Sequence, residues 1–302
     1  MEPLFDTDLV RQRRLRALRA AVPGADFLMR HVCDDLAERL SAVERRFPVA
    51  ADLFSGSAIP ANTLLESGKV GEVIRIETDD ALFGAIGASL DGMKGLVAPP
   101  ETVKLLPESI DLAVSVLALQ QANDVPGMLI QARRALRPDG LFLAAMAGQG
   151  TLAELRESLL AAEAELSGGV SPRVAPFAEV REAGALLQRA GFALPVADVE
   201  PLTVRYDTMF GLMHDLRVMG VTNPLAARTR RPATRAFFAR AAEIYAERFS
   251  DPDGRVRATF SIIWMSGWAP HASQQQPLRP GSAKVSLASV LGDASANPRD
   301  GE

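Results

Sequence analysis

The sequence has one cysteine, Cys33, among 302 residues, so no disulfide can form within the chain and zinc sites built on several cysteines are excluded. An excess of positive charge is also missing, because 33 lysine and arginine residues stand against 37 aspartate and glutamate residues. The net charge of -4 excludes the strongly positive field of a dedicated nucleic-acid-binding protein. We therefore expect a reducing, cytoplasmic location and no nucleic-acid partner.

Long hydrophobic runs are absent as well. No stretch of about 18 uninterrupted apolar residues occurs, so the sequence predicts no transmembrane helix. The histidines His31, His214 and His271 lie far apart and form no local metal-binding or hydrolase motif. We therefore predict no metal site, although a non-haem iron site assembled from distant residues stays open. With 48% hydrophobic residues, the chain can build one large domain or two small ones.

Strand and helix patterns alternate along the first half of the chain. Apolar runs predict strands at 49–54, 70–77, 95–98, 110–119 and 141–147, and helical periodicity predicts helices at 34–47, 59–67, 80–90 and 125–136. The segment 110–119 is nearly all apolar and rich in β-branched residues, as expected of a central strand buried on both faces. This alternation predicts an α/β fold with an open parallel sheet.

The second half is mostly helical. Periodicity predicts helices at 151–166, 177–190, 208–219 and 234–249, an extended segment at 194–206, and a long antiparallel strand at 256–268. Thr151 followed by Glu154 predicts a capping box at the start of the first of these helices. We divide the chain into an N-terminal helical segment 1–46, a cofactor-binding core 47–150, a helical cap with the sixth strand 151–255, a last strand 256–269 and a mostly disordered tail 270–302.

Candidate binding residues follow the predicted strands, because an open parallel sheet binds ligands beyond the carboxyl ends of its strands. The turn after the first strand, Asp52–Ala58, contains Gly56, which would let the backbone approach a cofactor; the alternative is an ordinary strand-to-helix turn. Glu77 ends the second strand, where its carboxylate could accept hydrogen bonds from ribose hydroxyls or simply carry charge at a helix N-terminus. Polar residues near Ser115 are a third candidate, or just a loop.

A family resemblance rests on several segments in order. The segments VAADLFSG, VIRIETDDAL, ESIDLAVSVLALQQANDVPGML and ALRPDGLFLAAM resemble class I S-adenosylmethionine-dependent methyltransferases. Further segments, among them LFDTDLVRQRRLRA, GQGTLAELRESL, YDTMFGLMHDLRVMG and DGRVRATFSIIWMSGW, resemble bacterial homologues of the mitochondrial respiratory complex I assembly factor 5. The resemblance extends over nearly the whole chain.

The resemblance implies a seven-stranded, mostly parallel Rossmann-like methyltransferase sheet, with an inserted helical cap and a preceding N-terminal helical segment. It implies S-adenosylmethionine as the cofactor, with binding residues that we transfer to Asp52, Phe54, Gly56, Glu77, Glu101 and Ser115. The match is incomplete: Phe54 and Ala58 replace glycines of the family's first motif, and Gln120-Gln121 replaces a His-Trp pair. No catalytic residue is predicted.

The same resemblance implies a function. We expect a methyltransferase-like protein that acts on a protein side chain or a small molecule and is linked to assembly of the respiratory NADH–quinone oxidoreductase, a subunit of which is the expected protein substrate. The alternatives are a non-catalytic assembly factor or an arginine hydroxylase on the same fold.

Overall fold

The computed structural model describes residues 2–83, 91–167, 169 and 171–275. The chain up to Pro270 forms one compact unit, in which the described residues build a seven-stranded sheet of order β3-β2-β1-β4-β5-β7-β6. The strands are β1 (Phe47–Leu53), β2 (Val70–Glu77), β3 (Met93–Val97), β4 (Ile110–Val116), β5 (Leu136–Ala147), β6 (Ala193–Tyr206) and β7 (Val256–Trp268). The first five strands pair in parallel, and β7 pairs antiparallel with both β5 and β6. The predicted mostly parallel α/β sheet is confirmed.

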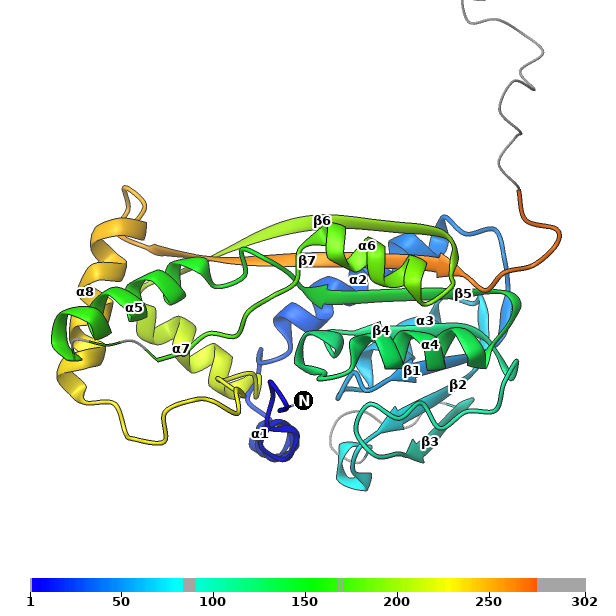
Figure 1. The fold of residues 1–302 in the computed structure, drawn as a ribbon, viewed down its shortest axis with the longest axis horizontal. Helices are drawn as coiled ribbons and strands as arrows, with labels where there is room; N and C mark the ends of the chain where they lie inside the picture. Colours follow the sequence, from blue (N-terminus) through cyan, green and yellow to red (C-terminus); the bar gives the residue numbers. More distant parts are fainter. Residues whose placement is uncertain (1, 84–90, 168, 170, 276–302) are drawn as a thin grey trace, which may run out of the picture. The chain divides into compact units, whose positions relative to one another are not determined.

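Helices cover both faces of the sheet (Figure 1). They are α1 (Thr7–Ala20), α2 (Phe27–Ser41), α3 (Ile59–Glu66), α4 (Val125–Ala135), α5 (Ala153–Ser167), α6 (Val180–Arg189), α7 (Met209–Val218) and α8 (Arg235–Phe249). Buried side chains of α2 and α3 share one core with the sheet, and those of α4 and α6 share a second core on the opposite face. Among the described helices, none has both the length and the apolar character needed to cross a membrane.

The central strand β4 supplies both cores, as its composition predicts. Leu112, Val114 and Val116 point into the core with α2 and α3, and Ile110 and Ala113 point into the core with α4 and α6. All five are fully buried. Both faces of β4 are therefore covered by helices.

The cap is built on the far part of β6 and β7. Residues before Ile262 in β7 pair with β6 but not with β5, so this antiparallel pair of strands extends beyond the rest of the sheet. Helices α5, α7 and α8 pack around it, with Phe237 and Tyr245 of α8 buried against Phe260 and neighbouring residues of β7 (Figure 1). Helix α1 lies between this cap and the carboxyl ends of the parallel strands.

Some element boundaries differ from the sequence prediction. Helix α2 spans Phe27–Ser41 rather than 34–47, because Phe47 pairs with Val70 as the first residue of β1. Strand β5 begins at Leu136, five residues before the predicted 141, so the segment 137–140 continues the sheet through an irregular register. The first turn of the predicted helix 80–90 is a short 3-10 helix, Asp80–Leu82, and residues 84–90 lie outside the described part, as does most of the predicted tail.

The predicted capping box at Thr151 and Glu154 is wrong. The Thr151 hydroxyl donates to the carbonyl of Ser261 (3.1 Å) and accepts from its N–H (3.0 Å). The Glu154 carboxylate accepts hydrogen bonds from the N–H and hydroxyl of Thr259. Both side chains therefore fasten the start of α5 to β7 and give acceptors to the N–H groups of Thr259 and Ser261.

Truncation of a β4 side chain tests this account of the core. We expect Leu112→Ala to lower the free energy of unfolding by about 3 kcal/mol, because the side chain is fully buried and its loss leaves a cavity. Leu106→Ala is the matched control, since Leu106 is 76% exposed and should cost less than about 0.5 kcal/mol. Urea unfolding followed by circular dichroism measures both values; equal losses would contradict the core assignment.

Candidate functional site

The loop after β1 is held in a left-handed backbone conformation at two positions. Phe54 has φ +59° and Gly56 has φ +71°. The N–H of Phe54 still bonds the carbonyl of Ile76 (2.9 Å), so the chain leaves the sheet directly after this residue. The Ser55 hydroxyl donates to Asp52 and accepts from the N–H of Val116 (3.1 Å), which fastens the loop to the end of β4. Glycine would adopt this positive φ freely. These contacts hold Phe54 in it in spite of its side chain, which costs about 1–2 kcal/mol of folding free energy.

Glu77 lies beneath this loop, at the end of β2. Its Oε1 accepts a hydrogen bond from the Gly56 N–H (2.8 Å) and a longer one from the Arg75 guanidinium (3.3 Å). Its Oε2 is buried and has no hydrogen-bond partner among the described residues. Burial, and then the nearby Asp52 carboxylate, raise the pKa of Glu77 to about 7. One oxygen therefore shapes the loop, and the other is a buried acceptor without a partner among the described residues.

Asp52 and Arg75 complete a buried charge group with Glu77. The two residues face each other in the β1–β2 register, with Arg75 Nε 3.8 Å from Asp52 Oδ2. Both are at most 2% exposed. Burial raises the pKa of Asp52 to about 6, and the opposing attraction of Arg75 limits that rise. One guanidinium can balance the charge of only one of the two buried carboxylates. Protonation of one carboxyl therefore removes the negative charge that would otherwise be uncompensated.

Helix α1 covers the loop with its arginine side chains. Arg14 donates to the carbonyl oxygen of Phe54 (2.9 Å) and to Gln121 Oε1 (3.3 Å), and Arg11 pairs with Asp79 (2.8 Å). A Cβ on Gly56 would approach Arg14 Nη1 to 3.3 Å, so the glycine gives room for this side chain. No residue of α1 is fully buried, so polar contacts of this kind and partly buried side chains hold the helix in place.

A cavity of about 1100 Å³ opens from the loop. Ser55, Gly56 and Ser57 line one end of it, Gln120 and Gln121 lie beside them, and the cap and the α1–α2 segment form the remaining walls. The Oε1 of Gln120 is buried and has no hydrogen-bond partner within the described ranges. A second, much smaller pocket of about 60 Å³ lies on the other side of Arg14 and Gln121. Small-molecule sites usually measure about 300–1000 Å³, so the large cavity has room for a cofactor and part of an acceptor.

The predicted binding residues have different places in this arrangement. Gly56 lines the large cavity, and Phe54 and Glu101 line the small pocket. Asp52 and Ser115 are fully buried below the loop, where the Ser115 hydroxyl donates to the carbonyl of Leu53 (3.0 Å) and joins β4 to β1.

Glu101 has a role that the sequence did not reveal. Its two carboxylate oxygens accept from the N–H groups of Asn123 and Asp124, just before α4 begins. Both oxygens are therefore already engaged by the backbone. Arg14 was likewise missed as a site residue, because the arginine-rich pattern of α1 looks the same whether it faces solvent or a binding loop.

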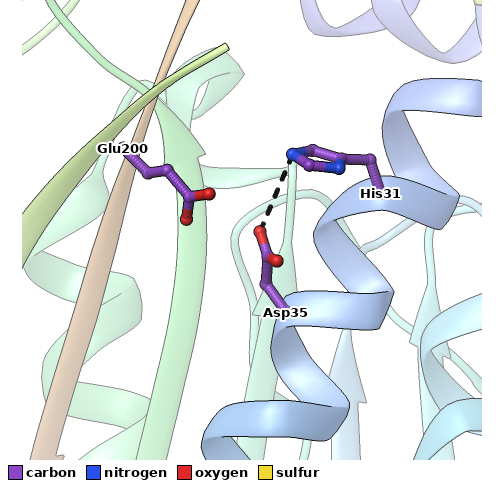
Figure 2. Close-up of side chains that lie close together, drawn as sticks. All are labelled: His31, Asp35 and Glu200. Atoms are coloured by element: carbon purple, nitrogen blue, oxygen red, sulfur yellow. Dashed lines mark ion pairs between the residues drawn. The ribbon is translucent and has the colours of Figure 1, made fainter.

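A cluster of possible metal ligands lies apart from the loop. Figure 2 shows His31 and Asp35, one turn apart on α2, facing Glu200 of β6. Their candidate ligand atoms all lie within 4.8 Å of one another, and His31 Nε2 is 3.9 Å from Asp35 Oδ2. Arg39, on the same face of α2, pairs with Asp198 of β6 at 2.8 and 2.9 Å. We interpret the cluster as part of this polar contact between α2 and β6.

Known proteins similar to this chain carry two different activities in their names. The family described as "Methyltransferase domain" matches residues 52–144. Arginine-hydroxylase NDUFAF5, mitochondrial, of Homo sapiens is 37% identical over 286 residues, which cover 94% of this chain and 82% of that protein. Malonyl-[acyl-carrier protein] O-methyltransferase of Gallionella capsiferriformans (strain ES-2) is 30% identical over 283 residues, which cover 89% of this chain and 93% of that protein.

Solved structures agree on the architecture. A protein of Bacillus halodurans C-125 described as a candidate methyltransferase superposes with a TM-score of 0.55 at 14% identity, covering 78% of this chain and 98% of that one. At this level of identity the likeness concerns the fold, and the chemistry has to be argued from the site.

The raised pKa of Glu77 makes its contribution to stability depend on pH. The folded protein binds this proton more tightly than the unfolded chain, so the stabilisation is complete below the ordinary value of 4.5 and is lost as the pH rises through about 7. We expect Glu77→Gln to gain about 2–3 kcal/mol of unfolding free energy relative to wild type between about pH 5 and about pH 8.

The control is Glu72→Gln, on the same strand, where Glu72 pairs with Lys94 at the surface. This variant should differ from wild type by less than about 0.5 kcal/mol over the same range. Urea unfolding at several pH values gives both curves. A pH-independent difference between Glu77→Gln and wild type would contradict the assignment.

Proposed function

The chain belongs to the class I S-adenosylmethionine-dependent methyltransferase family, in the group that includes mitochondrial arginine-hydroxylase NDUFAF5, and on this basis we propose that it binds S-adenosylmethionine and transfers the methyl group to an acceptor in the large cavity. The observation that carries the proposal is the free, buried Oε2 of Glu77 below the Gly56 loop. A carboxylate oxygen at the carboxyl end of the second strand is the acceptor that a ribose hydroxyl requires.

Other features of the loop support the same ligand. Gly56 and Ser57 lead into the N-terminus of α3, where the Ser57 hydroxyl accepts from the Ile59 N–H (3.2 Å) and the positive end of the helix dipole favours a carboxylate. The Gln120 Oε1 atom adds a second unsatisfied acceptor at the end of β4. These groups offer hydrogen bonds to the hydroxyl, carboxylate and ammonium groups of the cofactor.

Two features set a condition on binding. Glu77 lines neither cavity, because the loop and Arg14 lie over it. A ligand therefore reaches Oε2 only when the Gly56 loop shifts and α1, with Arg14, moves aside. Since α1 has no fully buried residue, this displacement exposes little core.

The chemistry requires little of the protein beyond orientation. S-adenosylmethionine, when bound, supplies an electrophilic methyl group on a sulfonium. The loop and α3 hold one reactant, and the cap holds the other, in a cavity walled mainly by apolar side chains. Bringing the two reactants together in line supplies much of the rate enhancement, so no strong base is needed. This agrees with the absence of a predicted catalytic residue.

The acceptor and its biological setting are further parts of the proposal. We propose a protein side chain or a small molecule as the acceptor, in the cytoplasm, with a link to assembly of the respiratory NADH–quinone oxidoreductase. The name of the human relative supports an alternative, arginine hydroxylation, and the replacement of glycine by Phe54 supports a non-catalytic assembly factor. Recovery of oxidoreductase subunits with the tagged protein, together with no methylated product, would favour that last alternative.

Calorimetry with S-adenosylmethionine and S-adenosylhomocysteine tests the cofactor site. We expect binding by the wild type and a tenfold to hundredfold weaker affinity for Glu77→Ala, because about 1.5–3 kcal/mol is lost when a charged acceptor is removed. Glu72→Ala, on the same strand but outside the site, should bind like wild type. Absence of heat with either ligand at millimolar concentration, or equal affinity of the two variants, would overturn the proposal.

A further inference from the structure

The large cavity has an unusual charge balance. Five arginines line it, Arg13, Arg14, Arg30, Arg173 and Arg217, and among the described residues one acid, Asp26, does. Two of the arginines are neutralised nearby: Arg30 pairs with Asp26 at 2.6 Å, and Arg173 pairs with Glu163 at 2.7 Å. The other three have no carboxylate within 4 Å in the part of the chain that the structure describes.

The unpaired arginines are incompletely compensated. Arg13 donates hydrogen bonds to the carbonyl oxygens of Thr222 and Asn223. Arg14 donates to the carbonyl oxygen of Phe54 and to Gln121 Oε1, so the acceptors of both arginines are neutral. Burial lowers the pKa of both guanidinium groups, and for Arg13 the neighbouring charges of Arg228 and Arg16 act in the same direction. Asp6 and Glu77 oppose these effects only from a distance. A further negative charge in the cavity would therefore be stabilised.

The remaining wall of the cavity is apolar. Side chains from four helices form it, including Phe27, Leu155, Leu159, Met213, Leu216 and Phe238. All but Phe27, which begins α2, belong to the cap helices α5, α7 and α8. A ligand that contacts both the arginines and the apolar side chains needs a charged head group and an apolar chain.

We propose that this cavity binds a single-chain amphipathic carboxylate, with its head toward Arg13 and Arg217 and its apolar chain against α5, α7 and α8. Carboxylates form charge-assisted hydrogen bonds with guanidinium groups, and the chain buries apolar surface of the cap. Beside Arg13 and Arg217, a cationic acceptor head such as an arginine side chain would meet unpaired positive charges and is disfavoured. As the identity of the acceptor, this inference rests on the proposed methyltransferase function, but binding of the carboxylate requires no cofactor.

Calorimetry without S-adenosylmethionine tests the inference separately from the cofactor site. The probes are decanoate, decanol and decylamine, which share a chain length and differ in head charge. We expect decanoate to bind at least tenfold more tightly than decanol, and decylamine to bind most weakly. Equal affinities for decanoate and decanol, or tighter binding of decylamine, would overturn the proposal.

Paired variants locate the head group. The double variant Arg13→Gln with Arg217→Gln should weaken decanoate binding at least tenfold and leave decanol binding unchanged. Arg248→Gln removes an arginine of α8 that pairs with Glu157 outside the cavity, and it should bind decanoate like wild type. Arg217 is exposed and has no ion-pair partner among the residues that the structure describes. The single variant Arg217→Gln therefore guards against loss of folding through Arg13, and it should weaken decanoate binding by itself.

A membrane surface is the competing source of such a ligand. Phosphatidylglycerol vesicles present carbon chains and negative charge without a free, single-chain carboxylate. Binding to these vesicles without binding of decanoate would assign the arginines to a lipid surface and overturn the proposal. Binding of decanoate that vesicles do not reproduce supports it.

Discussion

The carboxyl edge of this sheet depends on one guanidinium buried between two carboxyls. Arg75 lies next to both Asp52 and Glu77, and all three side chains are almost completely shielded from water. Removing one partner from such a group leaves a buried charge without compensation, so the three positions constrain one another. Through Glu77 the constraint reaches the Gly56 N–H, and through Gly56 it shapes the loop that opens the large cavity.

Relatives of this chain carry the names of two different activities, and the chain itself divides into a sheet and a cavity with walls from other elements. The loop, Glu77 and α3 lie at the carboxyl edge of the sheet, where we propose that the cofactor binds. The other walls of the large cavity come from α1, α2 and the cap. Changes in those walls would leave the sheet intact, and function resides in sites built on a fold rather than in the fold itself.

The sequence prediction agrees best with the structure where the local pattern of apolar residues matches the burial that the folded chain gives them. The predicted strands 70–77 and 256–268 have the same ends as β2 and β7. In each, the positions of the apolar residues match the positions that are buried in the sheet. Agreement fails where a polar side chain serves a distant strand. Thr151 and Glu154 have the spacing of a capping box, yet β7 offers them partners about a hundred residues along the chain.

The sequence by itself determined the α/β class, the central position of β4, and Glu77 as an acid at the end of the second strand, because these follow from periodicity and from strand ends that meet at one edge. Only the tertiary structure decided which candidates face a ligand. In the folded chain, both oxygens of Glu101 accept from backbone N–H groups, and the Ser115 hydroxyl donates to the Leu53 carbonyl. Arg14 bonds the carbonyl of Phe54, in a loop 40 residues away. Such contacts depend on how α1 and the cap pack on the sheet, and local sequence carries no record of the partner's position.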